Sequence, residues 1–310
     1  MNKEINQPLV SIVVNCFNGE KFLNQAINSV LKQTYINWEI IFWDNCSTDN
    51  SCNIIHSYAE NIKYYKSEFN TKLGEARKLA LQKCKGKYLA FLDVDDYWHP
   101  EKLQKQVSLM CKDSSALSYT GSYLIDENNK ILKTYKPKYF SGFHFPTLLE
   151  NFDINLPSTI IDLDILRSNN LFFDERIVGS EEYDLFMQIA AEFRITVLDE
   201  VLCYYRISKN SLTNQTLEFR ASDKILTFEK LNIKYPNLKE KYKKKWDFAY
   251  NKIFYYKMQY YIFLNDKKNA IKEINKIKFT NYKYFTVWLI LKINIKLYKF
   301  VLKKYDLRGI

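Results

Sequence analysis

Apolar and polar residues alternate in blocks over the first hundred positions. Short runs rich in apolar, β-branched and aromatic residues occur at "LVSIVVNC" (9–16), "WEIIFW" (38–43), "IKYYK" (62–66) and "KYLAFLD" (87–93). Runs of this length and composition predict strands, and continuous apolar strands are typical of a parallel sheet covered on both faces. The first run ends at Asn18-Gly19, a dipeptide that favours a turn.

The segments between these runs carry helical patterns. In "EKFLNQAINSVLKQ" the apolar residues recur at helical spacing, at Phe22, Leu23, Ala26, Ile27, Val30 and Leu31. The Ser, Thr and Asp residues of "DNCSTDNS" suit the start of a second helix that reaches Tyr58, and a third is expected from about Gly74 to Cys84. This alternation predicts an α/β fold with a Rossmann-like, mainly parallel sheet flanked by helices.

Beyond Ser114 the pattern changes. "ALSYTGSYLID" and "KILKTY" flank "ENN" and predict a hairpin, and "SEEYDLFMQIAAEF" (180–193) predicts a helix capped by Ser180. "ITVLDEVLCYYRI" is expected to be extended, and from about Leu217 onward the pattern is mostly helical. We therefore expect an α/β domain over residues 1–215, with halves at about 8–113 and 114–215, and a basic, mainly helical extension over residues 216–310.

Three carboxylates fall within four positions of "FLDVDDYW", directly after the fourth predicted strand, at Asp93, Asp95 and Asp96. Ligands of parallel sheets bind at the carboxyl ends of strands, where the polar clusters at 15–18 and 44–49 are also expected. Carboxylate oxygens suit Mg²⁺ or Mn²⁺, which commonly bridge one or two carboxylates and substrate phosphates. The alternative is a cluster of N-cap acids ahead of the helix that Pro100 opens.

Charge is unevenly distributed, which changes the expected partners. The net charge is +11, but residues 220–310 hold 23 Lys and Arg against 7 Asp and Glu, a net of +16, whereas the first 219 residues have a net of −5. A strongly basic segment suits an anionic surface, either membrane lipid or nucleic acid. The apolar content of the segment and the absence of a recognition motif argue against nucleic acid.

The last apolar stretch, "TNYKYFTVWLILKINIKLYKFVLKKY", is interrupted by Lys292 and Lys296 and is a poor candidate for a membrane span. Lysines at 292, 296, 299 and 303 would share one helical face, and apolar residues at 291, 295, 298 and 302 a neighbouring face. Such a basic amphipathic helix predicts binding at a membrane interface. The alternative is that these helices pack on the α/β domain and that the lysine face is solvated.

The six cysteines contain no C-x-x-C pair and, with three scattered histidines, suggest no zinc site. The N-terminal "MNKEINQPLVSIVV" lacks the apolar run of a signal peptide. We expect a cytoplasmic protein with reduced cysteines, held peripherally on the inner face of the cytoplasmic membrane.

The order of motifs is more specific than any one of them. "SIVVNCFNGEKFLNQAINSVLKQTYINWEIIFWDNCSTDNS", then "NTKLGEARKLAL", then "GKYLAFLDVDDYWHPEKL" strongly resembles the family 2 glycosyltransferases of the GT-A type. Further on, "FDERIVGSEEYDLFMQIA" and "YYRISKNSLT" resemble the acceptor-side motifs of that family. The resemblance covers about residues 8–212 and is most specific in its first half.

The resemblance implies roles on the donor side. Asn15, Phe17 and Asn18 would line the nucleotide pocket, and Asp44 would contact the base. Arg77 would lie near the base or the diphosphate. Each role has a structural alternative: Asp44 as the cap of the next helix, Phe17 as part of the core, and Arg77 as a solvated helix residue.

The resemblance also implies roles for the acids. Asp93 and Asp95 would form a D-x-D motif that handles the ribose and the metal–diphosphate, with Asp95 as the main metal ligand and Asp96 in support. The family usually has Glu-Asp where this chain has Glu181-Glu182, so Glu182 would be the general base and Glu181 the reserve. Alternatively, Glu182 serves only the helix dipole.

A departure from the family pattern lies in "YYRISKNSLT". The family often has His in the place of Ser208, so any role for a histidine there is lost, and Arg206 is a weak candidate for a contribution.

The resemblance implies an inverting glycosyltransferase of the hexosyltransferase type that uses a nucleoside-diphosphate sugar, a UDP-sugar foremost, with Mn²⁺ or Mg²⁺. The acceptor would be a hydroxyl of a glycan or lipid-linked oligosaccharide in cell-surface polysaccharide or glycoconjugate assembly. The chemistry is consistent, because a metal offsets charge on the leaving diphosphate and a carboxylate takes the acceptor proton. The rival class is a non-catalytic basic module that binds membrane or nucleic acid.

Overall fold

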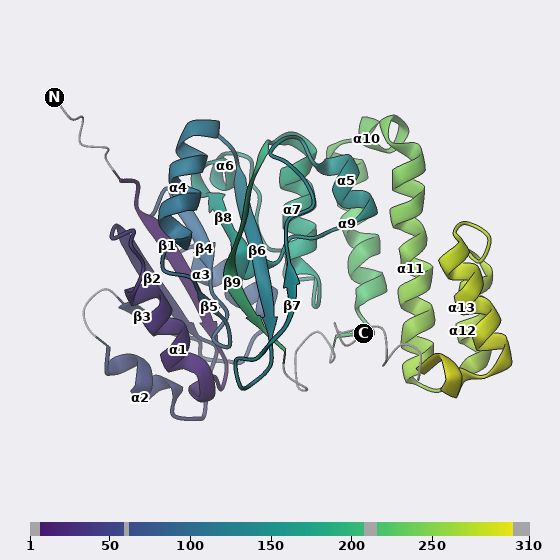
Figure 1. Cartoon of the computed structure of the whole chain (residues 1–310), viewed down its shortest axis with the longest axis horizontal. Coiled ribbons are helices and arrows are strands. Elements are labelled where there is room, and N and C mark those ends of the chain that lie inside the picture. The colour runs from purple at the N-terminus through teal and green to yellow at the C-terminus, as the bar shows by residue number, and fades with distance from the viewer. Residues whose placement is uncertain (1–6, 59–61, 208–215, 300–310) are drawn as a thin grey trace. The chain divides into compact units, whose positions relative to one another are not determined.

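The computed structural model of the chain describes residues 7–58, 62–207 and 216–299 (Figure 1). The chain divides into two compact units, each described here by itself. The first comprises residues 1–144, 153–175 and 185–207, and the second comprises residues 145–152, 176–184 and 208–310. The boundary predicted near residue 215 lies at the end of segment 208–215, outside the described residues, and stays a prediction.

One nine-stranded sheet organises the first unit. Its order is β3-β2-β1-β4-β8-β6-β9-β5, with β7 paired to β6. The strands are β1 (Val10–Cys16), β2 (Trp38–Asp44), β3 (Ile62–Lys66), β4 (Tyr88–Phe91), β5 (Tyr97–Trp98), β6 (Leu117–Ile125), β7 (Ile131–Tyr135), β8 (Thr159–Asp162) and β9 (Ile195–Arg206). The four predicted N-terminal strands are parallel to one another, and the predicted hairpin is β6–β7. From β8 onward the sheet is mixed, because β8 runs antiparallel to both β4 and β6.

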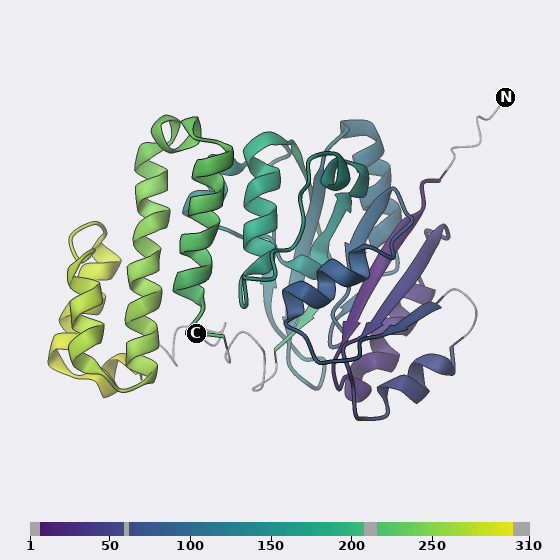
Figure 2. The same ribbon diagram turned by 180° about the vertical axis from the view of Figure 1, so that it is seen from behind.

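Helices cover both faces of this sheet. α1 (Glu20–Leu31) and α4 (Lys102–Asp113) lie on the face seen in Figure 1, and α3 (Leu73–Leu81) and α6 (Leu163–Ser168) lie on the face seen in Figure 2. α2 (Ser51–His56) follows β2, and the single turn η1 (Leu156–Ser158) precedes β8. The predicted apolar stripe of α1 enters the core through Leu23, Ala26, Ile27 and Val30, all fully buried. Burial of each large aliphatic side chain contributes roughly 1.5–3 kcal/mol.

The parallel strands end at one edge of the sheet. Cys16, the last residue of β1, pairs with Asp44, the last residue of β2, and Val13 pairs with Phe91 at the end of β4. The polar segments that follow these three strands therefore leave the sheet side by side, as the sequence predicts.

The second unit is helical. It contains α5 (Phe145–Glu150), α9 (Arg220–Lys234), α10 (Asn237–Lys241), α11 (Lys243–Phe263), α12 (Lys267–Asn275) and α13 (Tyr282–Ile293), and α7 (Glu181–Glu192) begins in it. Met258, Ile262, Ala270, Ile274, Leu291 and Tyr298 form a core between the last three helices. Within the described ranges, none of the helices combines the length and apolarity needed to cross a bilayer.

The predicted basic helix near the C-terminus is interrupted. α13 ends at Ile293, Asn294 is extended at φ −156° and ψ 126°, and helical backbone resumes at 295–299. The Asn294 side chain accepts a hydrogen bond from the backbone N–H of Lys296, so it starts a new turn instead of continuing the old one. The prediction of one lysine face is wrong for Lys292 and Lys296, and Leu302 and Lys303 lie outside the described residues.

Candidate active site

The acid loop, residues 93–96, forms a tight turn after β4. The backbone N–H of Asp96 donates to the carbonyl of Asp93 at 3.0 Å, which turns the chain back on itself. Asp93 and Asp95 are half-buried and Asp96 is 1 % exposed. The turn thus holds three carboxylates close together at the sheet edge.

Packing against α1 fixes the position of this loop. A Cβ atom added to Gly19, just before α1, would lie 2.8 Å from Cγ2 of Val94 and 3.1 Å from Sγ of Cys16. Real Cβ atoms essentially never approach as closely as 2.8 Å, so a larger residue at position 19 would force Val94 to shift. Packing against the start of α1 therefore positions the acid loop.

Arg206, the last residue of β9, holds the loop from the other side. Its backbone N–H donates to Oδ1 of Asp96 at 2.7 Å, and its Nε donates to the carbonyl of Asp95 at 2.7 Å. The guanidinium also donates to the carbonyl of Asp126 at 2.9 Å and to side-chain oxygens of Gln25 and Asn129 at 2.8 and 2.9 Å. Arg206 is 3 % exposed, so it is a buried cation beside the partly buried acid loop.

The electrostatics of the loop favour a bound cation. Burial, followed by the neighbouring Asp93 carboxylate, raises the pKa of Asp95 to about 6, against a lowering effect of Arg206. Burial and the Asp95 and Asp93 carboxylates raise the pKa of Asp96 well above its ordinary value. Oδ2 of Asp96 is buried without a hydrogen-bond partner among the described residues. A cation near these oxygens would relieve both the repulsion and the desolvation.

Asp93 is also paired with the arginine predicted to lie near the donor. Nη2 of Arg77, on α3, donates to Oδ1 of Asp93 at 3.1 Å, and the Arg77 guanidinium lies 5.8 Å from the ring centre of Phe173. Arg77 is 4 % exposed, so the alternative of a solvated helix residue is wrong.

The donor set fits a metal completed by a substrate. Within the described residues, no three Asp, Glu, His or Cys side chains converge as a protein-only metal cage would require. Mg²⁺ and Mn²⁺ are usually held by one or two carboxylates, with water and phosphate oxygens in the other positions. Asp95 and Asp93 would supply the protein's share of such a site.

The turn after β1 is bonded to the loop after β2. Asn18 has a left-handed backbone at φ 53°, and its side-chain oxygen accepts from the backbone N–H of Thr48 at 2.8 Å. The backbone N–H of Asn18 donates to Oγ of Ser47 at 3.0 Å. Asn15 is buried, whereas the Phe17 ring is 49 % exposed, which excludes Phe17 from the core. An exposed aromatic ring at this edge is available for stacking.

Asp44 shapes the loop after β2. It is fully buried, and its two oxygens accept from the backbone N–H of Ser47 and from the Tyr64 hydroxyl, each at 2.7 Å. The first bond lies in the β2–α2 loop and the second joins β2 to β3, whereas α2 begins at Ser51, so Asp44 does not cap that helix directly. Burial and the Cys52 and Asp44 side chains raise the pKa of Tyr64 far above its ordinary value, so its hydroxyl remains a donor.

Glu181 and Glu182 belong to the second unit, in the first turn of α7. Glu181 is 3 % exposed and Glu182 is half-buried. Lys224 of α9 lies with its Nζ 2.9 Å from the ring centre of Tyr183, and burial lowers its pKa while the Glu182 carboxylate opposes that shift. The hydroxyl of Ser180 donates to Asp223 at 3.3 Å. Glu182 thus has a buried lysine within electrostatic range.

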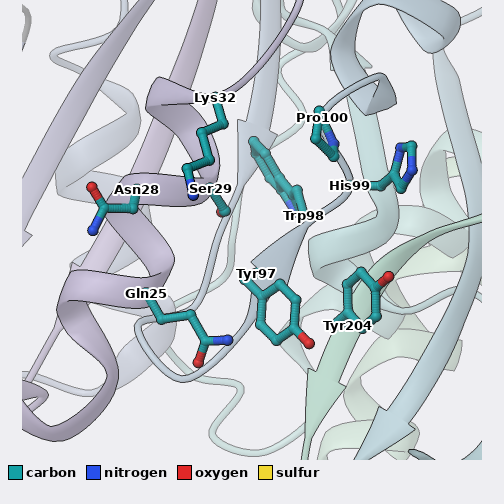
Figure 3. A pocket seen from close by; sticks show the side chains of 9 residues that line it. All are labelled: Gln25, Asn28, Ser29, Lys32, Tyr97, Trp98, His99, Pro100 and Tyr204. Atoms are coloured by element: carbon teal, nitrogen blue, oxygen red, sulfur yellow. The ribbon is translucent and has the colours of Figure 1, made fainter.

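A hollow of about 410 Å³ adjoins the acid loop between α1 and the β5–β9 edge. It is lined by Gln25, Asn28, Ser29, Lys32, Tyr97, Trp98, His99, Pro100 and Tyr204 (Figure 3). The rings of Tyr97 and Tyr204 stack with their centres 4.2 Å apart. The Gln25 amide points toward Tyr97 (Figure 3). Gln25 also accepts from Arg206, so the hollow and the acid loop share one hydrogen-bond network.

The sequence gives only a weak indication that Arg206 contributes to the site. It gives no indication that Tyr64 bonds to Asp44 or that Lys224 lies near Glu182. The only signal for Arg206 was its place in "YYRISKNSLT", because a buried role for an arginine depends on partners distant in sequence.

Comparison with known proteins agrees with this geometry. Residues 11–164 match the model of "Glycosyl transferase family 2". The UDP-Glc:alpha-D-GlcNAc-diphosphoundecaprenol beta-1,3-glucosyltransferase WfgD of Escherichia coli is 32% identical over 210 residues, which cover 66% of this chain and 80% of WfgD.

Two solved structures share the fold. Residues 1–349 of S. aureus TarS in complex with UDP-GlcNAc superpose with a TM-score of 0.69 at 19% identity, covering 96% of this chain and 91% of that one. The mannosyltransferase PcManGT from Pyrobaculum calidifontis, in complex with GDP-Man and Mn²⁺, gives a TM-score of 0.60 at 14% identity, covering 98% and 89%. The fold is that of the GT-A glycosyltransferases. The match to the family model and the sequence relationship to WfgD show that this chain belongs to glycosyltransferase family 2.

Proposed function

We propose that the chain is an inverting glycosyltransferase that moves a sugar from a UDP-sugar to a hydroxyl of a lipid-linked or growing glycan, with Mn²⁺ or Mg²⁺. The observation that carries the proposal is the acid loop, whose Asp95 has a raised pKa and lies where β1, β2 and β4 end together. The relatives use UDP-Glc or bind UDP-GlcNAc or GDP-Man, and WfgD supports a uridine nucleotide for this chain.

On the donor side, the protein would orient the nucleotide and hold its charge. The exposed ring of Phe17 offers a stacking surface, with Asn15, Asn18 and Asp44 around it for the nucleoside. The metal, when bound, would offset charge on the leaving diphosphate. Arg77, bonded to Asp93, adds a fixed positive charge beside the D-x-D motif.

On the acceptor side, Glu182 would take the proton of the attacking hydroxyl. It is more accessible than Glu181, which is 3 % exposed, so an acceptor hydroxyl could reach it more readily. A single displacement by that hydroxyl at the anomeric carbon would invert its configuration. Replacement of Glu182 by Gln should abolish transfer but spare donor binding, whereas Glu181→Gln should keep measurable transfer.

The acceptor would be lipid-linked. The name of WfgD specifies a diphosphoundecaprenol acceptor, and the basic segment after residue 220 suits an anionic membrane. The chain would therefore act in cell-surface polysaccharide assembly, peripherally at the cytoplasmic face of the membrane.

A screen of nucleotide sugars by thermal stabilisation tests the donor proposal. With Mn²⁺ present, UDP-sugars should raise the melting temperature more than GDP-, dTDP- or CMP-sugars do. Stabilisation by every nucleotide sugar in EDTA, equal to that in Mn²⁺, would contradict the metal-bridged mode. Salt-sensitive DNA binding without nucleotide-sugar binding would favour the rival class of a basic binding module.

A further inference from the structure

Helix α13 is apolar on two opposite faces. One face enters the core of the second unit, where Tyr284 and Leu291 are buried. The other face is exposed and presents a row of large apolar side chains at helical spacing: Tyr282 (76 %), Phe285 (37 %), Leu289 (43 %) and Ile293 (72 %). A surface helix ordinarily turns polar residues outward. Large apolar patches on a surface mark interaction sites.

Aromatic residues extend this row at its start. The ring of Phe279, which is 78 % exposed, stacks on Phe285 at 5.9 Å, and Phe285 stacks on Trp288 at 5.6 Å. We call Phe279, Tyr282, Phe285, Leu289 and Ile293 together the α13 stripe. Its aromatic end resembles the apolar face of helices that lie in the membrane interface, which is rich in Trp, Phe and Leu.

Lysines are abundant in this part of the chain, and two of them lie beside the stripe. Between Lys267 and Lys299 the sequence has nine lysines and one acid, Glu273. Glu273 is 7 % exposed and paired with Lys276, so it does not offset the exposed lysines. The Nζ atoms of Lys278 and Lys292 lie 4.7 and 4.9 Å from the ring centre of Trp288. Apolar side chains bordered by lysines match an anionic bilayer surface, into which the stripe inserts while the lysines contact headgroups.

We infer that the α13 stripe docks this chain on an anionic lipid surface. This surface differs from the one that the sequence predicts, because Leu291 and Tyr298 of the predicted apolar face are buried in the protein core. A second copy of the chain is a poorer occupant, since two copies would bring like-charged lysine borders together. The inference rests on the proposed function only in that a lipid-linked acceptor gives the docking its purpose.

Vesicle binding of the full chain tests the inference. Wild-type protein is mixed with vesicles of an equal mixture of phosphatidylcholine and phosphatidylglycerol, and the bound fraction is measured by sedimentation. The double variant Leu289→Asn, Ile293→Asn should bind at least about tenfold more weakly. The matched control is Ile233→Asn on α9, which also removes an exposed isoleucine (81 %) and should bind like wild type. High salt should weaken binding without abolishing it, because insertion of the stripe is apolar.

Three results would overturn the inference: no binding of wild-type protein to these vesicles, equal binding by the double variant, or a wild-type dimer that the double variant converts to a monomer. Light scattering of both proteins decides the third. Donor hydrolysis, measured in parallel, separates this inference from the proposed function. Vesicle binding without hydrolysis would refute the enzyme proposal alone, and hydrolysis without vesicle binding would refute the docking surface alone.

Discussion

Replacement of Arg206 by Gln is the change whose effect on the free energy of unfolding follows most directly from the structure. The wild-type guanidinium donates to four oxygens, those of Asp95, Asp126, Gln25 and Asn129, at 2.7 to 2.9 Å. A hydrogen bond to a charged group is worth about 1.5–3 kcal/mol, but bonds of one network are not additive. Loss of one member of a buried ionic network typically costs about 3–5 kcal/mol. We expect the free energy of unfolding to fall by that amount.

Two further variants separate charge from geometry. Arg206→Lys keeps the charge but cannot reach four acceptors at once, so it should lose about half as much stability. Arg167→Gln is the matched control, because Arg167 donates to the carbonyl of Cys84 at 2.7 Å, has only a long ion pair of 3.9 Å with the exposed Asp164, and has a side chain that is 47% exposed. The control should lose no more than about 1 kcal/mol. Urea unfolding in EDTA measures all three, provided that the m-value is unchanged.

A second measurement tests whether Arg206 also affects the pKa values of the acids, in addition to the stability of the fold. Arg206 lowers the pKa values of Asp95 and Asp96. Its removal should therefore shift the pH midpoint of Mn²⁺ binding upward, by about one unit in Arg206→Gln and much less in Arg206→Lys. Calorimetric titration with Mn²⁺ across pH measures the shift. A loss of stability with an unmoved midpoint would refute the electrostatic role, and a loss no larger than that of Arg167→Gln would refute the network argument.

The remaining predictions concern the same edge of the sheet. Gly19→Ala should destabilise the protein by about 1–3 kcal/mol and weaken Mn²⁺ binding, because its Cβ would displace Val94. Unaltered metal affinity would contradict the conclusion that the start of α1 positions the acid loop. Because the pKa of Asp95 is raised to about 6, the free energy of unfolding in EDTA should fall as pH rises through about 6. Asp95→Asn should remove up to about 3 kcal/mol of that fall, measured by urea unfolding at acidic and neutral pH. A fall of the same size in Asp95→Asn would contradict the assignment of this pKa to Asp95. Tyr64→Phe should cost about 1–2 kcal/mol by leaving one oxygen of Asp44 unpaired and should weaken UDP binding in calorimetry; equal UDP affinity would separate Asp44 from the donor site.

The features of the sequence with local causes were predictable. The strands β1, β2 and β4 are continuous apolar runs, and the carboxyl ends of parallel strands meet at one edge, so the location of the acid loop followed from pattern alone. Features that depend on distant partners were not predictable. Arg206 gains its role from Gln25, Asp95 and Asp126, which only the folded sheet brings together.

The C-terminal region shows a second kind of failure. The lysine spacing assumed one unbroken helix, but Asn294 ends α13 and starts a new turn with its own side chain. Periodicity also could not tell which apolar face of α13 is buried, because both faces are apolar and only packing against α11 and α12 selects one.

Release of UDP from UDP-sugars by the purified protein tests the central claim most directly. We predict release that requires Mn²⁺ or Mg²⁺, that falls at least about 100-fold in Asp95→Asn, and that is unchanged in the control Asp164→Asn, an exposed acid far along the chain from the acid loop. Turnover that persists in EDTA, or that is equal in Asp95→Asn and wild type, would contradict the account of the acid loop as a metal–diphosphate site.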